Sequence, residues 1–525
     1  MPAAAPTARS TADRVETWRS FGQIPGVLEV LRGGGDERIA LDPLTRRDVY
    51  GCRDRPETDA ALFASSTASS VSERGLAAAQ VGWLQLAAAQ SSPSNLLADW
   101  FDAIRGRILK YCGAPSADCI LAASGTDAEL IALALAAGGL RRPLTNIVLA
   151  PSETGRGVAT AAEGRHFQNS APFAAGVGAG TRLAGWERAD IRVETVEIRD
   201  LAGAPRALSA VEGDVRTRVR AAIASGRGAL VHLIDVSKTG REGLGLEAAR
   251  RIAAEAPDRT LVIADCCQLR CSAERLRALL DAGFLVALTG SKFAGGAPFS
   301  AALVAPERWL ARVEASLLPA GLGVHSALLD WPPILRRALD GIAFRKANFG
   351  LGLRWLAALG ELERFAEIDP ALARKVRARF RSDVSRSAQR LTHASLEPCD
   401  GDATRWPDTI ATLRLRRRDR GVLSNAEAQD LRIALREPIA GGGKAAARRF
   451  HVGQPVAIGE ETALRVCLSA PLINAVADRM DNGSSFEAAY APLAAEIDAL
   501  FEKWAFVAGR LRNAEPDAAT IRGAR

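Results

Sequence analysis

Residues 285–293 read Leu-Val-Ala-Leu-Thr-Gly-Ser-Lys-Phe, an apolar run that passes through a turn of small residues and reaches a lysine. The chain has only seven lysines among its 68 basic residues, so a lysine at the end of a predicted strand calls for a reason. An amine can lose its proton and form an imine with an aldehyde, which a guanidinium cannot do. Taken alone, the pattern is more typical of an ordinary solvated side chain than of an imine-forming Lys292.

A second apolar run, residues 261–265, reads Leu-Val-Ile-Ala-Asp and ends on an acid. Residues 272–283 between the two runs predict a helix, with Ser first, leucines on one face and Gly last. Strand, helix and strand form a parallel crossover, whose strands end at the same edge of a sheet, where open α/β sheets bind ligands. Asp265 and Lys292 are therefore expected to face one crevice. A pyridoxal phosphate site needs this pair, a lysine for the aldehyde and a carboxylate that keeps the pyridine nitrogen protonated.

A third element, residues 118–135, reads as a strand, a Ser-Gly-Thr turn at 124–126 and a helix. Such a turn at a helix start offers free backbone N–H groups, the positive end of the helix dipole and hydroxyl groups, which together bind anions. Asp127 and Glu129 in the first turn also suit the dipole, so a simple capped helix explains the turn as well. The order of turn, acid and lysine along the chain favours a pyridoxal phosphate site.

These motifs give the chain a resemblance to the fold type I pyridoxal phosphate enzymes, and within them to the class V aminotransferase and cysteine desulfurase branch. That branch has a Ser-Gly-Thr-like phosphate turn, an Asp-x-x-Gln segment and a Ser-Gly-His-Lys segment followed by glycines, which match residues 124–126, 265–268 and 289–292 here. The resemblance covers residues 90–345 well and the remainder loosely. It implies an α/β fold, with a mostly parallel sheet sandwiched by helices and a smaller α+β C-terminal domain.

The resemblance also implies roles for individual residues. Lys292 carries the internal aldimine and later moves protons, Asp265 pairs with the pyridine nitrogen, and Gln268 donates to the phenolic oxygen of the ring. The phosphate is expected to be held by Ser124, Gly125, Thr126, Thr289 and Ser291.

Two positions depart from the pattern of the branch. The branch places a His after a Glu on the strand that follows the helix of the Ser-Gly-Thr turn. The ring of this His stacks on the cofactor. Thr154 stands there in this chain, so either Thr154 covers the pyridine or another group does, for which His166 is a candidate and otherwise a structural residue. Ser291 replaces the His that normally precedes the lysine. Both changes indicate that the chain is not a standard cysteine desulfurase.

Two further strands bear on the substrate. Residues 463–469 resemble the late Leu-Arg-(Ile/Val) strand of the family, in which the arginine binds the substrate carboxylate through a bidentate pair. Arg465 has that position, although a solvent-facing strand residue fits the alternation equally. The strand at 229–234 brings Asp235, Ser237 or Lys238 near the ring. Lys238 is the rival of Lys292 for the aldehyde, and it ranks lower because it precedes the acid.

The expected activity is a transformation of an amino acid or related amine, with transamination first. The alternative is β- or γ-elimination, including C–S cleavage, for which Cys399 in a loop-like segment is either the mobile thiol or a plain surface thiol. A pyridoxal phosphate fold used only as a binding protein is the third hypothesis. By family resemblance the enzyme is a homodimer.

The length of 525 residues predicts two or three domains. We expect an N-terminal extension at 1–90 that contributes to the small domain or to dimer contacts, a cofactor-binding large domain at 91–345, and a C-terminal small domain at 346–525. No apolar run approaches the roughly 20 residues of a membrane helix, and the start of the chain shows no secretion signal. The expected location is the cytoplasm, with no membrane partner.

Cysteine usage and charge exclude other classes. The eight cysteines are scattered and lack a second cluster or a histidine partner, so no metal site is expected. The net charge of +8 could indicate a nucleic-acid partner, and the densest basic run is at residues 414–420. That run reads as an edge strand that ends in a solvated turn, and no RNA-binding signature is present, so no nucleic-acid partner is expected.

Overall fold

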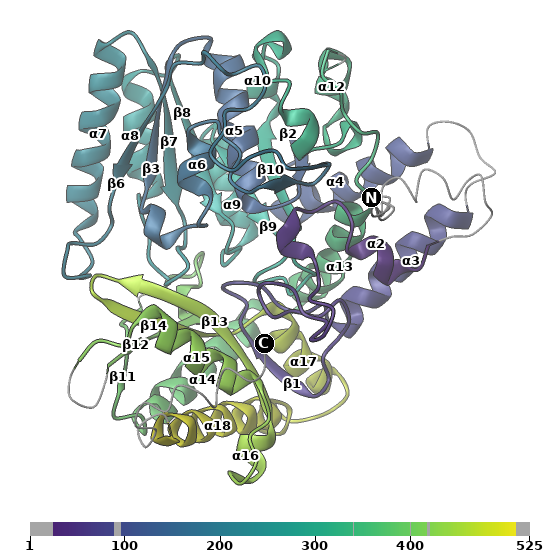
Figure 1. Ribbon diagram of the computed structural model, residues 1–525, viewed down its shortest axis with the longest axis vertical. Helices are drawn as coiled ribbons and strands as arrows, with labels where there is room; N and C mark the ends of the chain where they lie inside the picture. The colour runs from purple at the N-terminus through teal and green to yellow at the C-terminus, as the bar shows by residue number, and fades with distance from the viewer. Residues whose placement is uncertain (1–24, 89–95, 340, 400, 417–420, 511–525) are drawn as a thin grey trace, which may run out of the picture.

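The large sheet of the molecule has seven strands, of which six run in one direction (Figure 1). The computed structural model describes residues 25–88, 96–339, 341–399, 401–416 and 421–510. In spatial order the strands are β2 (Ala117–Ala122), β10 (Ala301–Pro306), β9 (Leu285–Thr289), β8 (Thr260–Cys266), β7 (Gly228–Ile234), β3 (Leu144–Leu149) and β6 (Ile191–Val196). Only β10, which the sequence analysis did not predict, lies antiparallel to its neighbours. The predicted mostly parallel sheet is confirmed.

The predicted crossover between the acid and the lysine is present. Strand β8 is followed by α9 (Ala273–Asp281), and β9 returns parallel to β8, with Ile263 opposite Leu285. The hydroxyl of Ser272 caps the helix by accepting from the N–H of Arg275 at 3.2 Å. Both strands therefore end at the same edge of the sheet, as the spacing predicted.

Helices cover both faces of the large sheet, which explains why its central strands are apolar throughout. On one face lies α5 (Gly125–Leu140), most of whose side chains are buried. On the other face pack α4 (Leu96–Cys112), α7 (Leu208–Ala224), α8 (Leu246–Glu255) and α9. Figure 1 shows this layered body above the second sheet.

The second sheet has five strands and joins segments from the two ends of the chain. In spatial order they are β1 (Ala60–Phe63), β13 (Arg449–Ile458), β14 (Glu461–Cys467), β12 (Ile410–Leu415) and β11 (Ala394–Leu396). Strand β1 lies parallel to β13, and the other pairs are antiparallel. The helices of this part are α14 (Pro370–Ala388), α15 (Asn425–Arg436), α17 (Ala470–Asp481) and α18 (Phe486–Arg510).

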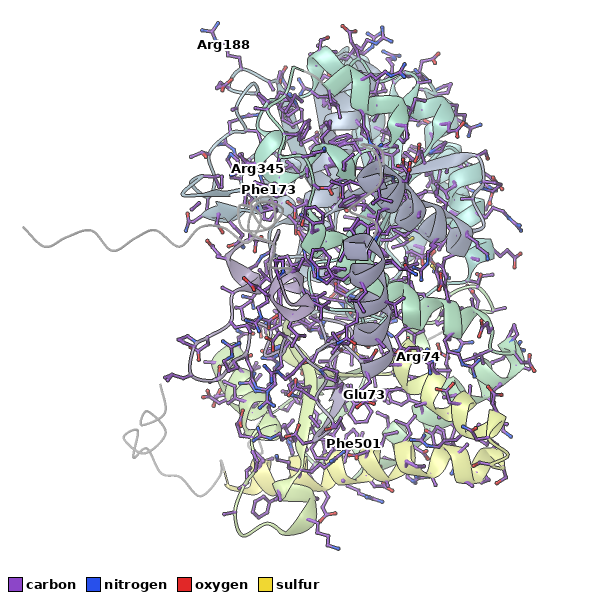
Figure 2. All side chains as sticks on the ribbon, turned by 90° about the vertical axis from the view of Figure 1, so that its right-hand side faces the viewer. Glu73, Arg74, Phe173, Arg188, Arg345 and Phe501 are labelled. Atoms are coloured by element: carbon purple, nitrogen blue, oxygen red, sulfur yellow. The ribbon has the colours of Figure 1, made fainter. Side chains whose placement is uncertain are left out.

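Two long helices follow one another in the sequence between β10 and β11. Helix α13 (Phe349–Ala366) ends before α14, because Asp369 caps a new helix that begins at Pro370. Helix α13 packs against α3 (Glu73–Ala88), which the sequence analysis did not predict. Figure 2 shows Arg74 of α3 beside the C-terminal helices, where it forms a 2.5 Å ion pair with Asp478.

The interpretation of the basic run as an edge strand is wrong. Strand β12 lies between β14 and β11, and its Arg414 forms ion pairs with Glu397 at 2.6 Å and Glu461 at 3.0 Å. The remainder of the run, residues 417–420, lies outside the described residues. None of the helices in the described segments is long and apolar enough to cross a membrane.

Candidate active site

A cavity of about 400 Å³ opens where the strands of the large sheet end. The N-terminal segment lines it with residues such as Arg38, Tyr50 and Thr67, and the second sheet adds Gln454 and Arg465. The structure brings every sequence-predicted site residue to this cavity: Ser124, Gly125, Thr126, Thr154, Asp265, Gln268, Thr289, Ser291, Lys292 and Arg465.

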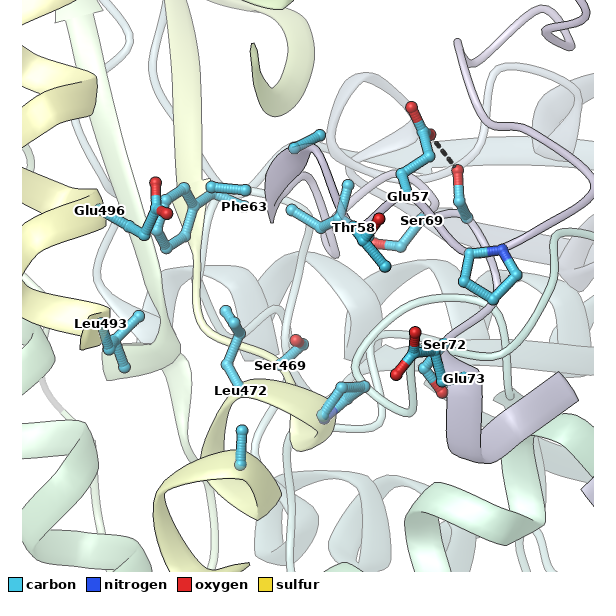
Figure 3. A pocket seen from close by; sticks show the side chains of 18 of the residues that line it. Glu57, Thr58, Phe63, Ser69, Ser72, Glu73, Ser469, Leu472, Leu493 and Glu496 are labelled. Atoms are coloured by element: carbon cyan, nitrogen blue, oxygen red, sulfur yellow. Dashed lines mark hydrogen bonds between the residues drawn. The ribbon is translucent and has the colours of Figure 1, made fainter. Parts of the chain in front are cut away.

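A second cavity of about 360 Å³ lies between the N-terminal segment and helices α17 and α18. Figure 3 shows Leu472 and Leu493 facing it, with Glu57 hydrogen-bonded to a neighbouring serine at its rim. None of the predicted site residues lines it. We therefore place the candidate active site in the first cavity.

Lys292 and Asp265 share the first cavity, and neither has a charged partner in the described part of the chain. Lys292 is half-buried in the turn after β9, and no described residue lies within hydrogen-bond or ion-pair distance of its amine. Asp265 is the sixth residue of β8, and its Oδ1 accepts from the backbone N–H of Cys267 at 2.9 Å. No basic side chain of the described residues pairs with this carboxylate. A free amine and a free acid across one cavity suit a ligand with an aldehyde and a basic ring nitrogen.

The Ser-Gly-Thr turn caps α5 and points free N–H groups at the cavity. Ser124 accepts from the N–H of Asp127 at 3.2 Å, while the N–H groups of Gly125 and Thr126 have no acceptor among the described residues. A Cβ at Gly125 would lie 3.0 Å from the sulfur of Cys267, so the glycine allows a close approach to the turn. With the dipole of a 16-residue helix behind it, the turn suits a phosphate group.

Three other predicted residues already have partners. The side-chain amide of Gln268 donates to the carbonyl of Ser66 at 3.1 Å, which leaves one of its N–H groups for a ligand. The hydroxyl of Thr289 donates to the carbonyl of Cys267 at 2.6 Å and can still accept. The hydroxyl of Thr154 donates to the carbonyl of Pro151 at 3.3 Å.

Arg465 is buried and faces the cavity, so the solvent-facing alternative for this residue is wrong. It is 2 % exposed, and its guanidinium donates to the carbonyls of Lys238 and Gln454 and to the hydroxyl of Thr67. Its Nε has no acceptor, and no carboxylate of the described residues pairs with it. Burial lowers the pKa of Arg465 to about 10, so the group stays charged at neutral pH. A buried cation without an acid is suited to an anionic ligand.

Two glutamates line the same cavity in opposite states of charge. Burial alone would raise the pKa of Glu153, but the charge of Arg199 and hydrogen bonds from Ser237 and Thr239 outweigh it and lower the pKa. Burial, with the charge of Asp265 added, raises the pKa of the Glu129 carboxyl well above its usual range. Glu153 is therefore ionised, and Glu129 is protonated.

The hydrogen bonds behind Glu129 agree with this assignment. The amide of Asn146 donates to the carbonyl of Ala162 at 3.1 Å, so its oxygen accepts from Nε2–H of His232 at 2.8 Å. Burial lowers the pKa of His232 to about 4, so the ring is neutral and its Nδ1 carries a lone pair. This Nδ1 lies 3.3 Å from Oε2 of Glu129. A lone pair facing a carboxyl group favours the protonated acid.

Replacing Glu129 with glutamine is expected to stabilise the protein at pH 8 and to have little effect near pH 4. Folding raises the pKa of Glu129, so its contribution is complete below the unfolded value and is lost as pH rises toward the folded value. The difference in unfolding free energy should grow by up to about 1.4 kcal/mol per pH unit in that window. Urea unfolding at pH 4, 6 and 8 measures it. Glu153→Gln is the matched control and should destabilise at pH 8, because it removes a paired charge. A uniform loss of stability in Glu129→Gln would contradict a protonated Glu129.

Sequence reasoning missed the residues that come from the N-terminal segment and from a strained loop. Arg38 is bound by Asp36 and reaches the hydroxyl of Ser124 at 3.5 Å, and its guanidinium lies 5.1 Å from the ring of Phe299. Phe299 has a φ of +70°, a strained value for a bulky residue, and its ring lies 6.2 Å from that of Tyr50. No short motif marks these positions in the sequence.

Several residues considered from the sequence lie outside the cavity. His166 stacks on His325, with ring centroids 5.1 Å apart, and so does not cover a ligand there. Cys399 is half-buried and does not line the cavity either. Asp235 pairs with Arg275 at 2.9 Å. Asp235 also lies near two buried thiols, those of Cys266 and Cys271.

The comparisons with known proteins agree with this architecture. No protein-family model matches the chain, and no curated protein matches it. Three solved structures are similar in fold. A NifS-like protein has 15% identity and a TM-score of 0.52 over 86% of this chain and 100% of its own. An alanine–glyoxylate aminotransferase from Nostoc sp. has 14% identity and a TM-score of 0.52 over 89% and 97%. A cysteine desulfurase from Thermococcus onnurineus NA1, solved as the apo form, has 14% identity and a TM-score of 0.50 over 81% and 95%. The chain therefore shares the fold of these three structures, which is the mostly parallel α/β architecture predicted from its motifs.

Proposed function

We propose that the chain is a pyridoxal phosphate enzyme that acts on an amino acid or related amine, with transamination as the leading reaction. The observation that carries the proposal is the unpaired amine of Lys292 across one cavity from the unpaired carboxylate of Asp265. When bound, pyridoxal phosphate supplies an aldehyde that joins amines and a ring that withdraws electrons from them. The fold similarity to an aminotransferase and to desulfurases supports the proposal.

Each predicted residue has a task in this proposal. Lys292 attaches the cofactor, and Asp265 holds a proton at its ring nitrogen, as a carboxylate next to a cation favours the charged form. Gln268 would donate its free N–H to the phenolic oxygen of the cofactor, and Thr154 would be the residue next to its ring. The phosphate is bound by the N–H groups and hydroxyls of Ser124, Gly125, Thr126, Thr289 and Ser291.

Lys292 also performs the proton transfer that defines the reaction. With the cofactor bound, its amine would accept the proton from the substrate Cα and, in transamination, would deliver it to the cofactor. In the alternative, β- or γ-elimination, a leaving group departs from the substrate side chain. Among the described residues, the cysteine that lines the cavity is Cys267, and it is buried. No observation therefore favours a persulfide-forming reaction.

A spectral scan followed by a single-turnover experiment tests the proposal. Purified protein mixed with pyridoxal phosphate should gain a visible absorption band at one equivalent per chain. Addition of an amino acid should then yield pyridoxamine phosphate and a keto acid, whereas elimination would yield pyruvate, ammonia or sulfide. A binding protein without activity would show the band and no product. Absence of the band would contradict the proposal altogether.

Replacing Arg465 with methionine is expected to weaken binding of α-amino acids about 10- to 100-fold, as a charge-assisted hydrogen bond is lost. We propose that its guanidinium binds the substrate α-carboxylate, because it is buried in the cavity without an acid. Spectral titration with an amino acid and with the amine that lacks the carboxylate measures the effect. The amine should bind both proteins alike. Equal weakening for both ligands would show a general structural role instead.

We further propose a homodimer, and the division into an extension at 1–90, a large domain at 91–345 and a small domain at 346–525. The pairing of β1 with β13 supports the assignment of the extension to the small domain. None of the eight cysteines forms a disulfide in the structure, which supports a reducing compartment such as the cytoplasm. Sedimentation equilibrium distinguishes a dimer from a monomer.

A further inference from the structure

The cavity is lined by more cations than acids that could pair with them. Among its acids, Glu129 is protonated, Glu153 is paired with Arg199, and only Asp265 remains free, as the partner of the cofactor ring. Arg38 has its own acid in Asp36. The cavity-lining cations that have no acid in the described part of the chain are Arg156, Lys238, Lys292 and Arg465.

The proposed function leaves two cations of this group unused, the exposed Arg156 and the half-buried Lys238. Lys238 follows β7, and its amine donates to the carbonyl of Thr154 at 3.0 Å. Its backbone carbonyl accepts from Nη1 of Arg465 at 3.3 Å, and the charge of Arg465 also acts on the Lys238 amine. Arg156, exposed at the rim, follows Thr154 closely in the chain.

Two neighbouring cations in a buried wall repel each other unless an anion binds between or beside them. Burial, followed by the charge of Arg465, lowers the pKa of Lys238 to about 7. Lys238 is therefore kept in an environment that penalises its charge, and the carbonyl of Thr154 does not offset the penalty. An anionic group of a ligand would do so.

We infer that the substrate is an amino acid with a second anionic group on its side chain, and that Lys238, assisted by Arg156 at the rim, binds this group while Arg465 binds the α-carboxylate. The inference rests on the proposed function for the position of the substrate. A carboxylate, a phosphate or a sulfonate satisfies the same chemistry, since each accepts charge-assisted hydrogen bonds from an ammonium group.

Spectral titration of the cofactor-loaded protein with matched pairs of amino acids tests the inference. The pairs are aspartate and asparagine, glutamate and glutamine, and phosphoserine and serine. The acidic member of at least one pair should bind about 10- to 100-fold more tightly than its neutral partner. The pair with the largest ratio identifies the carboxylate or the phosphate. Calorimetric titration of the same ligands into protein as purified gives a second measure of affinity that needs no absorption band.

Lys238→Gln is the informative variant because glutamine is uncharged yet keeps a donor for the carbonyl of Thr154. The acidic-to-neutral ratio should fall close to one in Lys238→Gln, with the affinity for the neutral ligand unchanged, and Lys238→Arg should keep most of the ratio. A ratio near one in the wild type, or an undiminished ratio in Lys238→Gln, would overturn the inference. Failure of the proposed function is a separate result: no absorption band and no spectral response to any amino acid, whatever the calorimetric ratios are.

Discussion

Replacing Lys292 with alanine is expected to abolish covalent attachment of the cofactor and to lower turnover by about 10³-fold or more. The variant loses both the amine that holds the aldehyde and the group that transfers the Cα proton, and positioned acid–base groups alone contribute about 10²- to 10⁴-fold. After reduction with borohydride and digestion, mass spectrometry should find the cofactor mass on the peptide that contains residue 292 in the wild type and on no peptide in the variant.

Lys238→Gln is the matched control, because the two lysines line one cavity. The control should still carry the cofactor mass on the peptide of Lys292. If the mass is found on the peptide of Lys238 in the wild type or in Lys292→Ala, Lys238 can hold the aldehyde and our assignment is wrong.

Replacing Asp265 with asparagine is expected to lower turnover by about 10²- to 10³-fold while the cofactor stays attached to Lys292. Removal of one partner of a buried charge pair costs about 3–5 kcal/mol, and each 1.4 kcal/mol corresponds to a factor of ten. Asparagine keeps the size and can still accept from the N–H of Cys267, so the loss would come from the proton at the ring nitrogen. Turnover and cofactor content per chain, measured on one preparation, separate the two effects.

Asp265→Glu serves as the comparison, since it keeps the charge and displaces it. Partial activity is expected there. Equal turnover in the wild type and in Asp265→Asn would show that the ring nitrogen has another partner, and Glu129 would then be the acid to replace next.

The centre of the site could be predicted from the sequence because its signals are local. Asp265 and Lys292 stand at the ends of strands, and the helix between them is marked by Ser272 and by leucines on one face. The parallel crossover then brings the two residues to one edge without any knowledge of distant contacts. The turn at Ser124 is defined in the same way by its own strand and helix.

The walls of the site could not be predicted, because long-range pairing forms them. Arg38 and Tyr50 line the cavity and belong to the segment that leads into β1, which pairs with β13 of the C-terminal sheet. The raised pKa of Glu129 could not be predicted either, because an acid in the first turn of a helix is already explained by its favourable interaction with the helix dipole. Burial in α5 and the charge of Asp265, neither of which the sequence shows, raise the pKa of its carboxyl.

The parallel pairing of β1 with β13 has a consequence for biosynthesis. Ala60 of β1 lies opposite Arg449 of β13. Strand β1 is synthesised early and therefore has no partner strand until most of the chain has been made. Contacts between such distant residues slow folding, and an unpaired strand edge exposed meanwhile invites association with other chains. Residues from both ends of the chain also line the cavity, so its wall is complete only after Arg465 has been synthesised.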